Sequence, residues 1–240
     1  MELLTIIPAR SNSKRLQNKN LLPFAGRPLI DWTLDLALKS NQIKTIHVST
    51  DSHEIAYRAE SKGISIDFLR PAELSRDDTP MALVIKHCLE EHKKRGKQFS
   101  HILLLQPTSP LRTKVQVDQA VKLLHAKSSN SGLISFSYMP SSINPRKMFS
   151  VFLDQSEMLL KYGGKEMNFE LDSQPRFPIR NGPAIYISEV AALYDGLYRK
   201  GIICFEMPWV DSIDIDTLED FYIAESIMLR RLEFGRMDSV

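Results

Sequence analysis

The stretch LLTIIPARSNSKRLQNKNLLPFAGRPLI, residues 3–30, runs from a predicted strand through a loop into the start of a predicted helix. Its apolar beginning is typical of a strand buried on both faces, as parallel strands are. The loop that follows carries five cationic side chains and no acidic one: Arg10, Lys14, Arg15, Lys19 and Arg27. The formal net charge of the whole chain is only +2, so this local excess is informative. The stretch predicts an α/β protein with a cationic loop after its first strand.

Strands and helices alternate in the rest of the chain as they do at its beginning. Further strands are predicted at 44–50, 64–69, 101–107, 132–138, 183–188 and 201–208, and helices at 28–40, 53–62, 80–95, 114–127 and 218–234. Thr79 and Pro80 fit a helix cap followed by a first-turn proline. Gly63 and Gly96 stand where helices are expected to stop. The alternation predicts an α/β fold with a doubly wound, mostly parallel sheet.

One segment, 139–182, interrupts this pattern with prolines, short strand-like pieces and a Gly-Gly turn. We expect a single domain over 1–240, with 139–182 as an inserted arm that serves for association or as a substrate lid. A long segment with few regular elements rarely hangs free from a compact domain. Its methionine, leucine and phenylalanine side chains need covering, and a symmetric dimer is the commonest way to cover them. We therefore predict a homodimer.

Composition argues against several classes of function. The nearly balanced charge does not indicate a general nucleic-acid or membrane surface. Cys88 and Cys204 lie far apart without a CxxC motif, which argues against a disulfide framework or a thiolate zinc site. The apolar run at the amino terminus is too short for a signal peptide, and no segment approaches the roughly 20 apolar residues that span a bilayer. We expect a cytoplasmic protein without nucleic-acid or membrane partners.

The cationic loop lies where open α/β sheets bind ligands, beyond the carboxyl end of a strand. Backbone amides of Ser-Asn-Ser-Lys, residues 11–14, together with Arg10 and Lys19, could neutralise a polyphosphate. The loop contains neither the GxxxxGK[ST] motif of a phosphate-binding loop nor a GxGxxG motif. The alternative is a solvated basic loop without a ligand.

A second constellation is DSIDIDTLED, residues 211–220. Asp214 and Asp216 are two residues apart, so on an extended chain they point to the same face. Two adjacent carboxylates repel each other unless a cation lies between them, and such hard oxygen ligands suit Mg²⁺, with Mn²⁺ as an alternative. Asp216 and Thr217 could instead cap the last helix. A dehalogenase-type phosphatase, whose nucleophile motif is also DxD followed by Thr, is excluded because that motif must open the catalytic domain.

Two further strand ends carry polar side chains. LLLQPTSPLR, residues 103–112, places Gln106 at the end of a buried strand and Arg112 after a proline-bounded turn. A carboxamide at that position can read the edge of a base, or the turn can simply cap the next helix. Arg70 stands at the end of the predicted strand 64–69. The spacing alone does not decide between these interpretations.

Taken together, these motifs resemble the CMP-sialic acid synthetases, the acylneuraminate cytidylyltransferases. The resemblance rests on PARSNSKRLQNKNL, VSTDS, LRPAELSRDDT, LLQPTSPLR, RNGPAIYI and DSIDIDTLEDF in this order over nearly the whole chain. The sibling enzymes that activate the eight-carbon sugar KDO have a serine-threonine-arginine-leucine first loop, which is absent here. The resemblance implies a Rossmann-like nucleotidyltransferase fold and an enzyme of the N-acylneuraminate cytidylyltransferase type, EC 2.7.7.43.

The resemblance also implies roles for individual residues. The catalytic residues would be Arg10, Lys19 and Asp214. Nucleotide binding would involve Arg10, Ser13, Lys19, Asn20, Arg70 and Gln106, with Arg70 and Gln106 at the cytosine. The acidic sugar would be bound by Gln106, Asn181, Lys147 and Arg176. Asp214 and Asp216 would bind Mg²⁺.

The implied reaction joins CTP to the anomeric hydroxyl of an acidic nonulosonic sugar and releases pyrophosphate. The sugar would be N-acetylneuraminate or a relative such as legionaminate or pseudaminate, because the arm at 139–182 differs most from the sialic acid enzymes. Pro183 and the Ser-Asn-Ser-Lys-Arg loop at 11–15 are further departures from the family's usual sequence. Two alternatives are another sugar nucleotidyltransferase, which predicts a glycine-rich first loop, and a non-catalytic nucleotide-binding protein of the same fold.

Overall fold

The computed structural model describes residues 2–11, 15–127, 132–138, 140, 150–154, 157–161, 178–179, 184–195 and 202–235. Within this part of the chain, a seven-stranded sheet has the order β11-β6-β10-β5-β1-β4, with β9 paired to β6. The bounds of these strands are β1 Leu3–Pro8, β4 Thr45–Ser49, β5 His101–Leu104, β6 Gly132–Tyr138, β9 Pro178–Ile179, β10 Tyr186–Glu189 and β11 Ile203–Glu206. β1 pairs in parallel with β4 and β5, and β11 with β6, whereas β10 runs antiparallel between β5 and β6.

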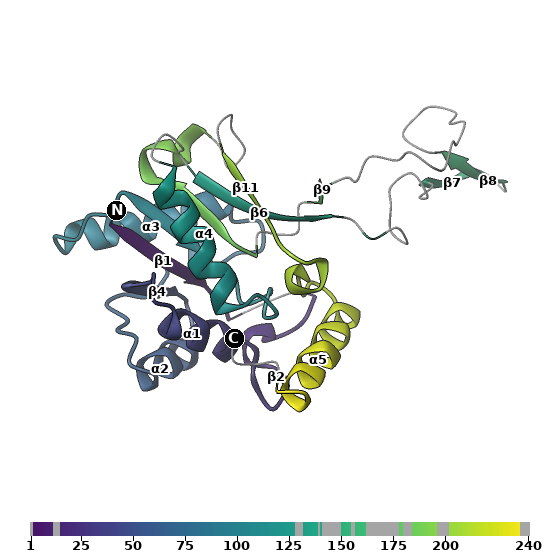
Figure 1. Ribbon diagram of the computed structural model, residues 1–240, viewed down its shortest axis with the longest axis horizontal. Helices are drawn as coiled ribbons and strands as arrows, with labels where there is room; N and C mark the ends of the chain where they lie inside the picture. The colour runs from purple at the N-terminus through teal and green to yellow at the C-terminus, as the bar shows by residue number, and fades with distance from the viewer. Residues whose placement is uncertain are drawn as a thin grey trace.

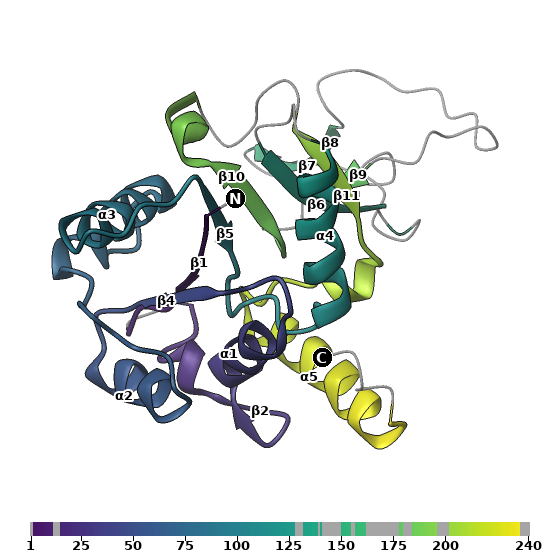
Figure 2. The same cartoon turned by 60° about the vertical axis from the view of Figure 1, so that its left-hand side comes forward.

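Helices cover both faces of this sheet (Figures 1 and 2). The α-helices are α1 Leu29–Lys39, α2 His53–Ser61, α3 Met81–Lys94, α4 Lys114–Ala126 and α5 Leu218–Glu233. Alternate residues of one strand serve opposite faces: Leu3 and Ile7 of β1 pack in the cluster that contains side chains of α1, α2 and α4. Leu4 and Ile6 pack in the cluster that contains side chains of α3. The doubly wound, mostly parallel α/β fold is thus confirmed.

A third apolar cluster lies beyond the carboxyl ends of the central strands. There α5 packs against α1 and against the short hairpin of β2 (Pro23–Phe24) and β3 (Arg27–Pro28). Phe24 makes edge-on contacts with Trp32 and Phe221. Ile213 and Ile215, just before α5, are buried in the same cluster. This cluster fixes the chain around the two predicted metal-binding aspartates.

Two expectations about local structure were wrong. Residues 64–69 form no strand, although Ile64 is buried and Phe68 partly buried. The segment lies outside the sheet, beyond edge strand β4. Phe68 stacks on His47 of β4, and just after the segment the amide of Arg70 donates to the carbonyl of Thr50. Thr79 is not the cap of α3 either: Pro80 occupies the N-cap position, with no side-chain cap. Gly63 and Gly96, by contrast, follow helix ends with positive φ, as expected.

Only part of the predicted arm at 139–182 belongs to the described residues. There β7 (Ser150–Asp154) and β8 (Glu157–Lys161) form an antiparallel pair of their own. β9 joins the main sheet through Ser137 and Tyr138 of β6. None of the helices in the described part of the chain combines the length and the apolar character that crossing a membrane requires.

Candidate active site

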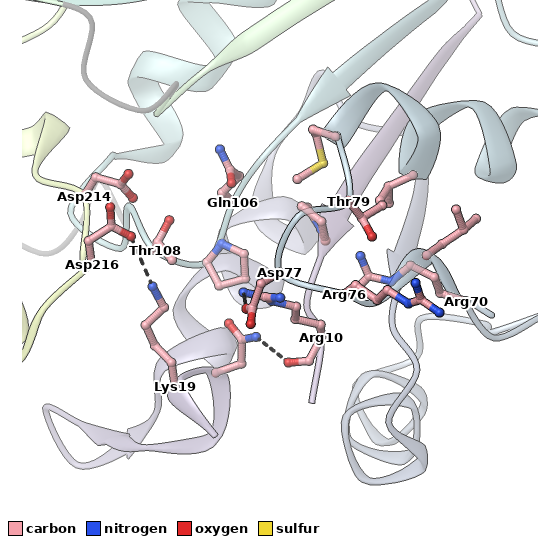
Figure 3. A pocket seen from close by; sticks show the side chains of 16 residues that line it. Arg10, Lys19, Arg70, Arg76, Asp77, Thr79, Gln106, Thr108, Asp214 and Asp216 are labelled. Carbon is pink, nitrogen blue, oxygen red and sulfur yellow. Dashed lines mark hydrogen bonds and ion pairs between the residues drawn. The ribbon is translucent and has the colours of Figure 1, made fainter. Parts of the chain in front are cut away.

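A pocket of about 240 Å³ opens at the carboxyl ends of β1 and β5 (Figure 3). It brings together segments from four regions of the chain: the first loop, the segment before α3, the turn after β5 and the segment before α5. Most of the predicted site residues meet here, namely Arg10, Lys19, Asn20, Arg70, Gln106, Asp214 and Asp216. The carboxyl ends of parallel strands are where α/β sheets bind their ligands.

The first loop is tied to the sheet at its beginning. The amide and hydroxyl of Ser11 both donate to the carboxylate of Asp51, at 2.8 and 2.7 Å, just beyond the end of β4. Asn20, which is buried, donates from Nδ2 to the carbonyl of Arg10 at 3.1 Å. These contacts hold the peptide unit that follows Arg10, so its guanidinium enters the pocket from a fixed base. Ser13, predicted to bind nucleotide, lies outside the described residues.

Lys19 spans the pocket toward the aspartate pair. Its Nζ donates to the carbonyl of Ile215 at 2.5 Å and lies 3.7 Å from Oδ1 of Asp216. Burial lowers the pKa of Lys19, while the neighbouring carboxylates of Asp216 and Asp214 oppose this shift. The ammonium group is therefore partly desolvated and is held beside the two carboxylates.

Asp214 and Asp216 point to the same side, as their spacing predicts. Ile213 and Ile215, which alternate with them, are buried, and the amide of Ile215 donates to the carbonyl of Thr108 at 2.8 Å. Asp216 is more exposed and pairs with Arg15 at 3.1 Å. The cap of α5 is Thr217, in a capping box with Asp220, so capping does not account for the Asp216 carboxylate.

Asp214 has an unusual environment for a carboxylate. Its Oδ1 is buried without a hydrogen-bond partner among the described residues. Burial raises the pKa of Asp214, and a hydrogen bond from Thr108 only partly offsets this effect. A cation would offset the cost of burying the ionised Asp214 carboxylate, since nearby positive charge favours the ionised form. The buried, unpartnered oxygen beside a second carboxylate therefore fits a hard divalent ion.

The set of donors limits what kind of metal site this can be. In the described part of the chain, no group of three or more His, Cys, Asp or Glu side chains could hold a metal ion. Mg²⁺ is commonly bound by one or two carboxylates, with water and substrate phosphates completing its octahedron. Asp214 and Asp216 therefore fit a magnesium ion that arrives with a phosphate-bearing substrate, and do not fit a closed structural site.

Arg70 lies at the end of the pocket away from the aspartate pair, whereas Gln106 lies nearer to Asp214 and Thr108 (Figure 3). Arg70 is 6% exposed, and its Nε and Nη2 have no partner within the described residues. Burial lowers the pKa of Arg70, an effect that the carboxylate of Asp51 partly opposes. A buried guanidinium with unused donors needs an acceptor, which a carbonyl or anionic group of a ligand can supply.

Arg112, also predicted at this strand end, does not line the pocket but supports the turn that carries Gln106. It is fully buried and donates to the carbonyls of Gln106 and Ala184, at 2.7 and 3.2 Å, and to the hydroxyl of Thr33 at 2.8 Å. It joins the turn after β5 to α1 and to the segment leading into β10. Asn181, Lys147 and Arg176, which were predicted to bind the sugar, lie outside the described residues.

Several pocket residues were not identified from the sequence. Arg76, Asp77 and Thr79 line it from the segment before α3, and Thr108 from the turn after β5. Oδ1 of Asp77 lies 2.5 Å from Nη2 of Arg10. The motifs LRPAELSRDDT and LLQPTSPLR contain all four, but their spacing does not show which side chains face the ligand. Only the three-dimensional arrangement distinguishes them.

The fold and the pocket define an α/β protein with a ligand site at the carboxyl edge of its sheet, where cationic side chains meet a carboxylate pair. A family model described as cytidylyltransferase matches residues 4–199, and the chain belongs to this family.

Three relatives show how the similarity extends. The chain is 32% identical over 231 residues to the CMP-N,N'-diacetyllegionaminic acid synthase of Legionella pneumophila, covering 95% of this chain and 97% of the relative. It is 31% identical to the N-acylneuraminate cytidylyltransferase of Escherichia coli O18:K1:H7, covering 96% of this chain but only 53% of that protein. It is 25% identical to the pseudaminic acid cytidylyltransferase of Campylobacter jejuni, covering 94% and 95%.

A solved structure supports the fold. The structure of a CMP:2-keto-3-deoxy-manno-octonic acid synthetase complexed with CTP superposes with a TM-score of 0.69 at 15% sequence identity. The match covers 96% of this chain and 100% of the other. At this identity the match shows a shared fold, and the site must be argued from its own residues.

Proposed function

We propose that this protein transfers CMP from CTP to the anomeric hydroxyl of an acidic nonulosonic sugar, with release of pyrophosphate. The observation that carries the proposal is that one pocket holds Asp214 and Asp216 with Lys19 beside them, and also Arg10 and the unpartnered guanidinium of Arg70. Membership in the cytidylyltransferase family supports the nucleotide, and the named relatives support the class of sugar.

In this reaction the anomeric oxygen forms a bond to the α-phosphorus of CTP while the bond from that phosphorus to the bridging oxygen breaks. Catalysis of such transfers consists mainly of positioning and charge stabilisation. Arg10 and Lys19 would hold the phosphate oxygens on which negative charge accumulates. Arg70 and Gln106 would bind the cytosine end, so that the α-phosphorus lies between the two groups of residues.

Asp214 and Asp216 would hold a magnesium ion, which when bound would polarise the phosphate oxygens and acidify a coordinated hydroxyl. Lys19 is held beside this pair through the carbonyl of Ile215, so its position depends on the same segment of chain. The described residues contain no side chain that we assign as general base. The proton of the anomeric hydroxyl would leave through solvent.

The particular sugar belongs to the proposal as well. Similarity along nearly the full length of a legionaminic acid synthase favours a legionaminate-type sugar, whereas the chain spans about half the length of the N-acylneuraminate enzyme from Escherichia coli. N-acetylneuraminate, which defines EC 2.7.7.43, and pseudaminate are the other candidates. The sequence-based prediction that Lys147, Arg176 and Asn181 bind this sugar still stands as a proposal.

Release of pyrophosphate tests the proposal. The protein is incubated with Mg²⁺, each of the four ribonucleoside triphosphates and a panel of N-acetylneuraminate, legionaminate, pseudaminate, KDO and a sugar 1-phosphate. We expect release with CTP and a nonulosonic acid. Release with UTP or another nucleotide and a sugar phosphate would support a different sugar nucleotidyltransferase. Binding of CTP without turnover of any sugar would support a non-catalytic protein.

A further inference from the structure

One ion pair in the pocket connects its two walls. Arg10 follows β1, whereas Asp77 lies on the segment between Arg70 and α3 (Figure 3). Their charged atoms are 2.5 Å apart, and the side chains of Arg10 and Asp77 are 28% and 30% exposed. The pair is therefore accessible from the pocket, and a ligand that enters can reach both partners.

The position of this pair conflicts with the role of Arg10 in the proposed function, on which this inference rests. A guanidinium binds phosphate and carboxylate through the same planar set of N–H donors. Asp77 occupies part of that set where the phosphates of CTP would bind. Asp214 and Asp216 can be compensated by a magnesium ion, but they lie with Lys19 across the pocket from Asp77 (Figure 3). A phosphate placed on Arg10 would thus meet the negative charge of Asp77.

We propose that Asp77 is a positioning residue that competes with phosphate for Arg10. In the empty pocket it holds the guanidinium in place, and CTP displaces it. After transfer, Asp77 returns to Arg10 as pyrophosphate leaves, which lowers the affinity of the enzyme for this product. Arg10 is thus paired with the carboxylate of Asp77 when no ligand is bound, and this pairing keeps Arg10 from retaining pyrophosphate.

This role has a kinetic signature that a merely structural ion pair does not have. An internal competitor weakens every ligand that uses Arg10 by the same factor, since the fraction of Arg10 available for binding is reduced. Removing its charge tightens the binding of CTP and pyrophosphate together. When product release limits turnover, kcat falls along with KM, so kcat/KM changes less than either. A structural ion pair, when broken, weakens binding instead.

The experiment compares Asp77→Asn, Asp77→Glu and the wild type. Asp78→Asn is the matched control, because Asp78 is the next residue, has the same charge and is exposed. Calorimetry measures binding of inorganic pyrophosphate, of CTP with Mg²⁺ and of cytidine. We expect Asp77→Asn to bind pyrophosphate and CTP about twofold to fivefold more tightly, the range for partly exposed ion pairs. Cytidine, which has no phosphate, should bind equally well to Asp77→Asn and to the wild type. Asp77→Glu and Asp78→Asn should bind all three ligands as the wild type does.

A double-mutant cycle makes the test specific for Arg10. In an Arg10→Ala background, Asp77→Asn should no longer tighten pyrophosphate binding, because the guanidinium for which Asp77 and pyrophosphate compete is absent. Unchanged or weaker pyrophosphate binding by folded Asp77→Asn protein would overturn the inference, as would the same gain in Asp78→Asn. If wild-type protein fails to bind CTP with Mg²⁺, the proposed function itself is wrong. If it binds CTP and Asp77→Asn changes nothing, only this inference fails.

Discussion

Arg10 and Lys19 are held so that their charges face the pocket while little of the core depends on them. Arg10 is anchored through its backbone by Asn20, and Lys19 through the carbonyl of Ile215. We expect Arg10→Ala and Lys19→Ala each to lower kcat/KM for CTP by roughly tenfold to a thousandfold, as loss of charge-assisted contacts does. The exposed Lys122 of α4 provides a control, Lys122→Ala. Near-normal turnover of both Arg10→Ala and Lys19→Ala would support the alternative that the cationic loop is a solvated surface loop without a ligand.

The ionised carboxylate of Asp214 should lower the stability of the metal-free folded protein and yet be needed for turnover. Because burial raises its pKa in the folded protein, the folded state binds the Asp214 proton more tightly than the unfolded state does. The stabilisation that this provides at low pH is lost as the pH rises through the raised pKa. Asp214→Asn should therefore raise the melting temperature at neutral pH without metal, with a smaller gain at acidic pH, while nearly abolishing turnover. A lower melting temperature at neutral pH would contradict this account.

At the scale of elements, capping of α5 and the proposed metal binding are assigned to neighbouring residues. Thr217 accepts from the amide of Asp220 as the N-cap, whereas the Asp216 carboxylate faces Arg15 and Lys19. Thr217→Ala should cost about 1 kcal/mol of stability and leave the dependence of the rate on Mg²⁺ unchanged.

Asp216→Asn should raise the Mg²⁺ requirement, and Glu219→Gln on the exposed first turn is its control. An effect of Asp216→Asn on melting alone would contradict a metal role.

The packing of β4 against α3 makes stability sensitive to acid. His47 of β4 stacks on Phe68 at 4.3 Å between ring centroids and meets His92 of α3 edge-on at 5.1 Å. Burial lowers the pKa of His47 to about 3, and His92, His87 and Arg95 add to the shift while Asp67 opposes it. Protonation of His47 is thus disfavoured by its burial and by the cationic groups on and just after α3.

The unfolded chain takes up a proton on His47 below a pH of about 6.5 that the folded protein does not. The free energy of unfolding should therefore fall as the pH decreases from about 6.5 toward about 3. A His47→Leu variant should show a flatter dependence over this window, measured by urea unfolding at a series of pH values. An equally steep fall in the variant would assign the acid sensitivity to other groups.

The sequence predicted the helices and most strands well because their patterns are local. Gly63 and Gly96 ended the helices as expected, and the two-residue spacing of Asp214 and Asp216 predicted their common face. Segment 64–69 shows the limit: its alternation reflects burial of Ile64 and Phe68, but a strand also needs a partner, which the pattern does not contain. Asp77 was missed for a similar reason, since its contact with Arg10 spans distant parts of the chain.

At the scale of the whole molecule, strand order was the feature that the sequence could not provide. β10 follows β6 along the chain yet inserts antiparallel between β5 and β6. This insertion brings the segment before β10 against the turn after β5, where Arg112 joins Ala184 to Gln106. Only long-range pairing determines such an arrangement. The pocket therefore depends on topology as much as on its motifs.

The predicted homodimer also belongs to the whole molecule, and we still propose it. The arm at 139–182 would form the interface and contribute to the sugar site of the second subunit. Light scattering should show a dimer at micromolar concentration, and Lys147→Ala and Arg176→Ala should raise the KM for the sugar more than the KM for CTP. A monomer would contradict the interface, and unchanged sugar KM values in both variants would contradict the shared site.

The most direct test of the central claim is the product formed from CTP and a nonulosonic acid with Mg²⁺. Phosphorus NMR should show one phosphodiester resonance of a CMP-sugar and an equal amount of pyrophosphate, only when both substrates are present. Asp214→Asn protein, folded by circular dichroism, should form neither. Consumption of CTP without sugar, or no phosphodiester with any nonulosonic acid of the panel, would contradict the account.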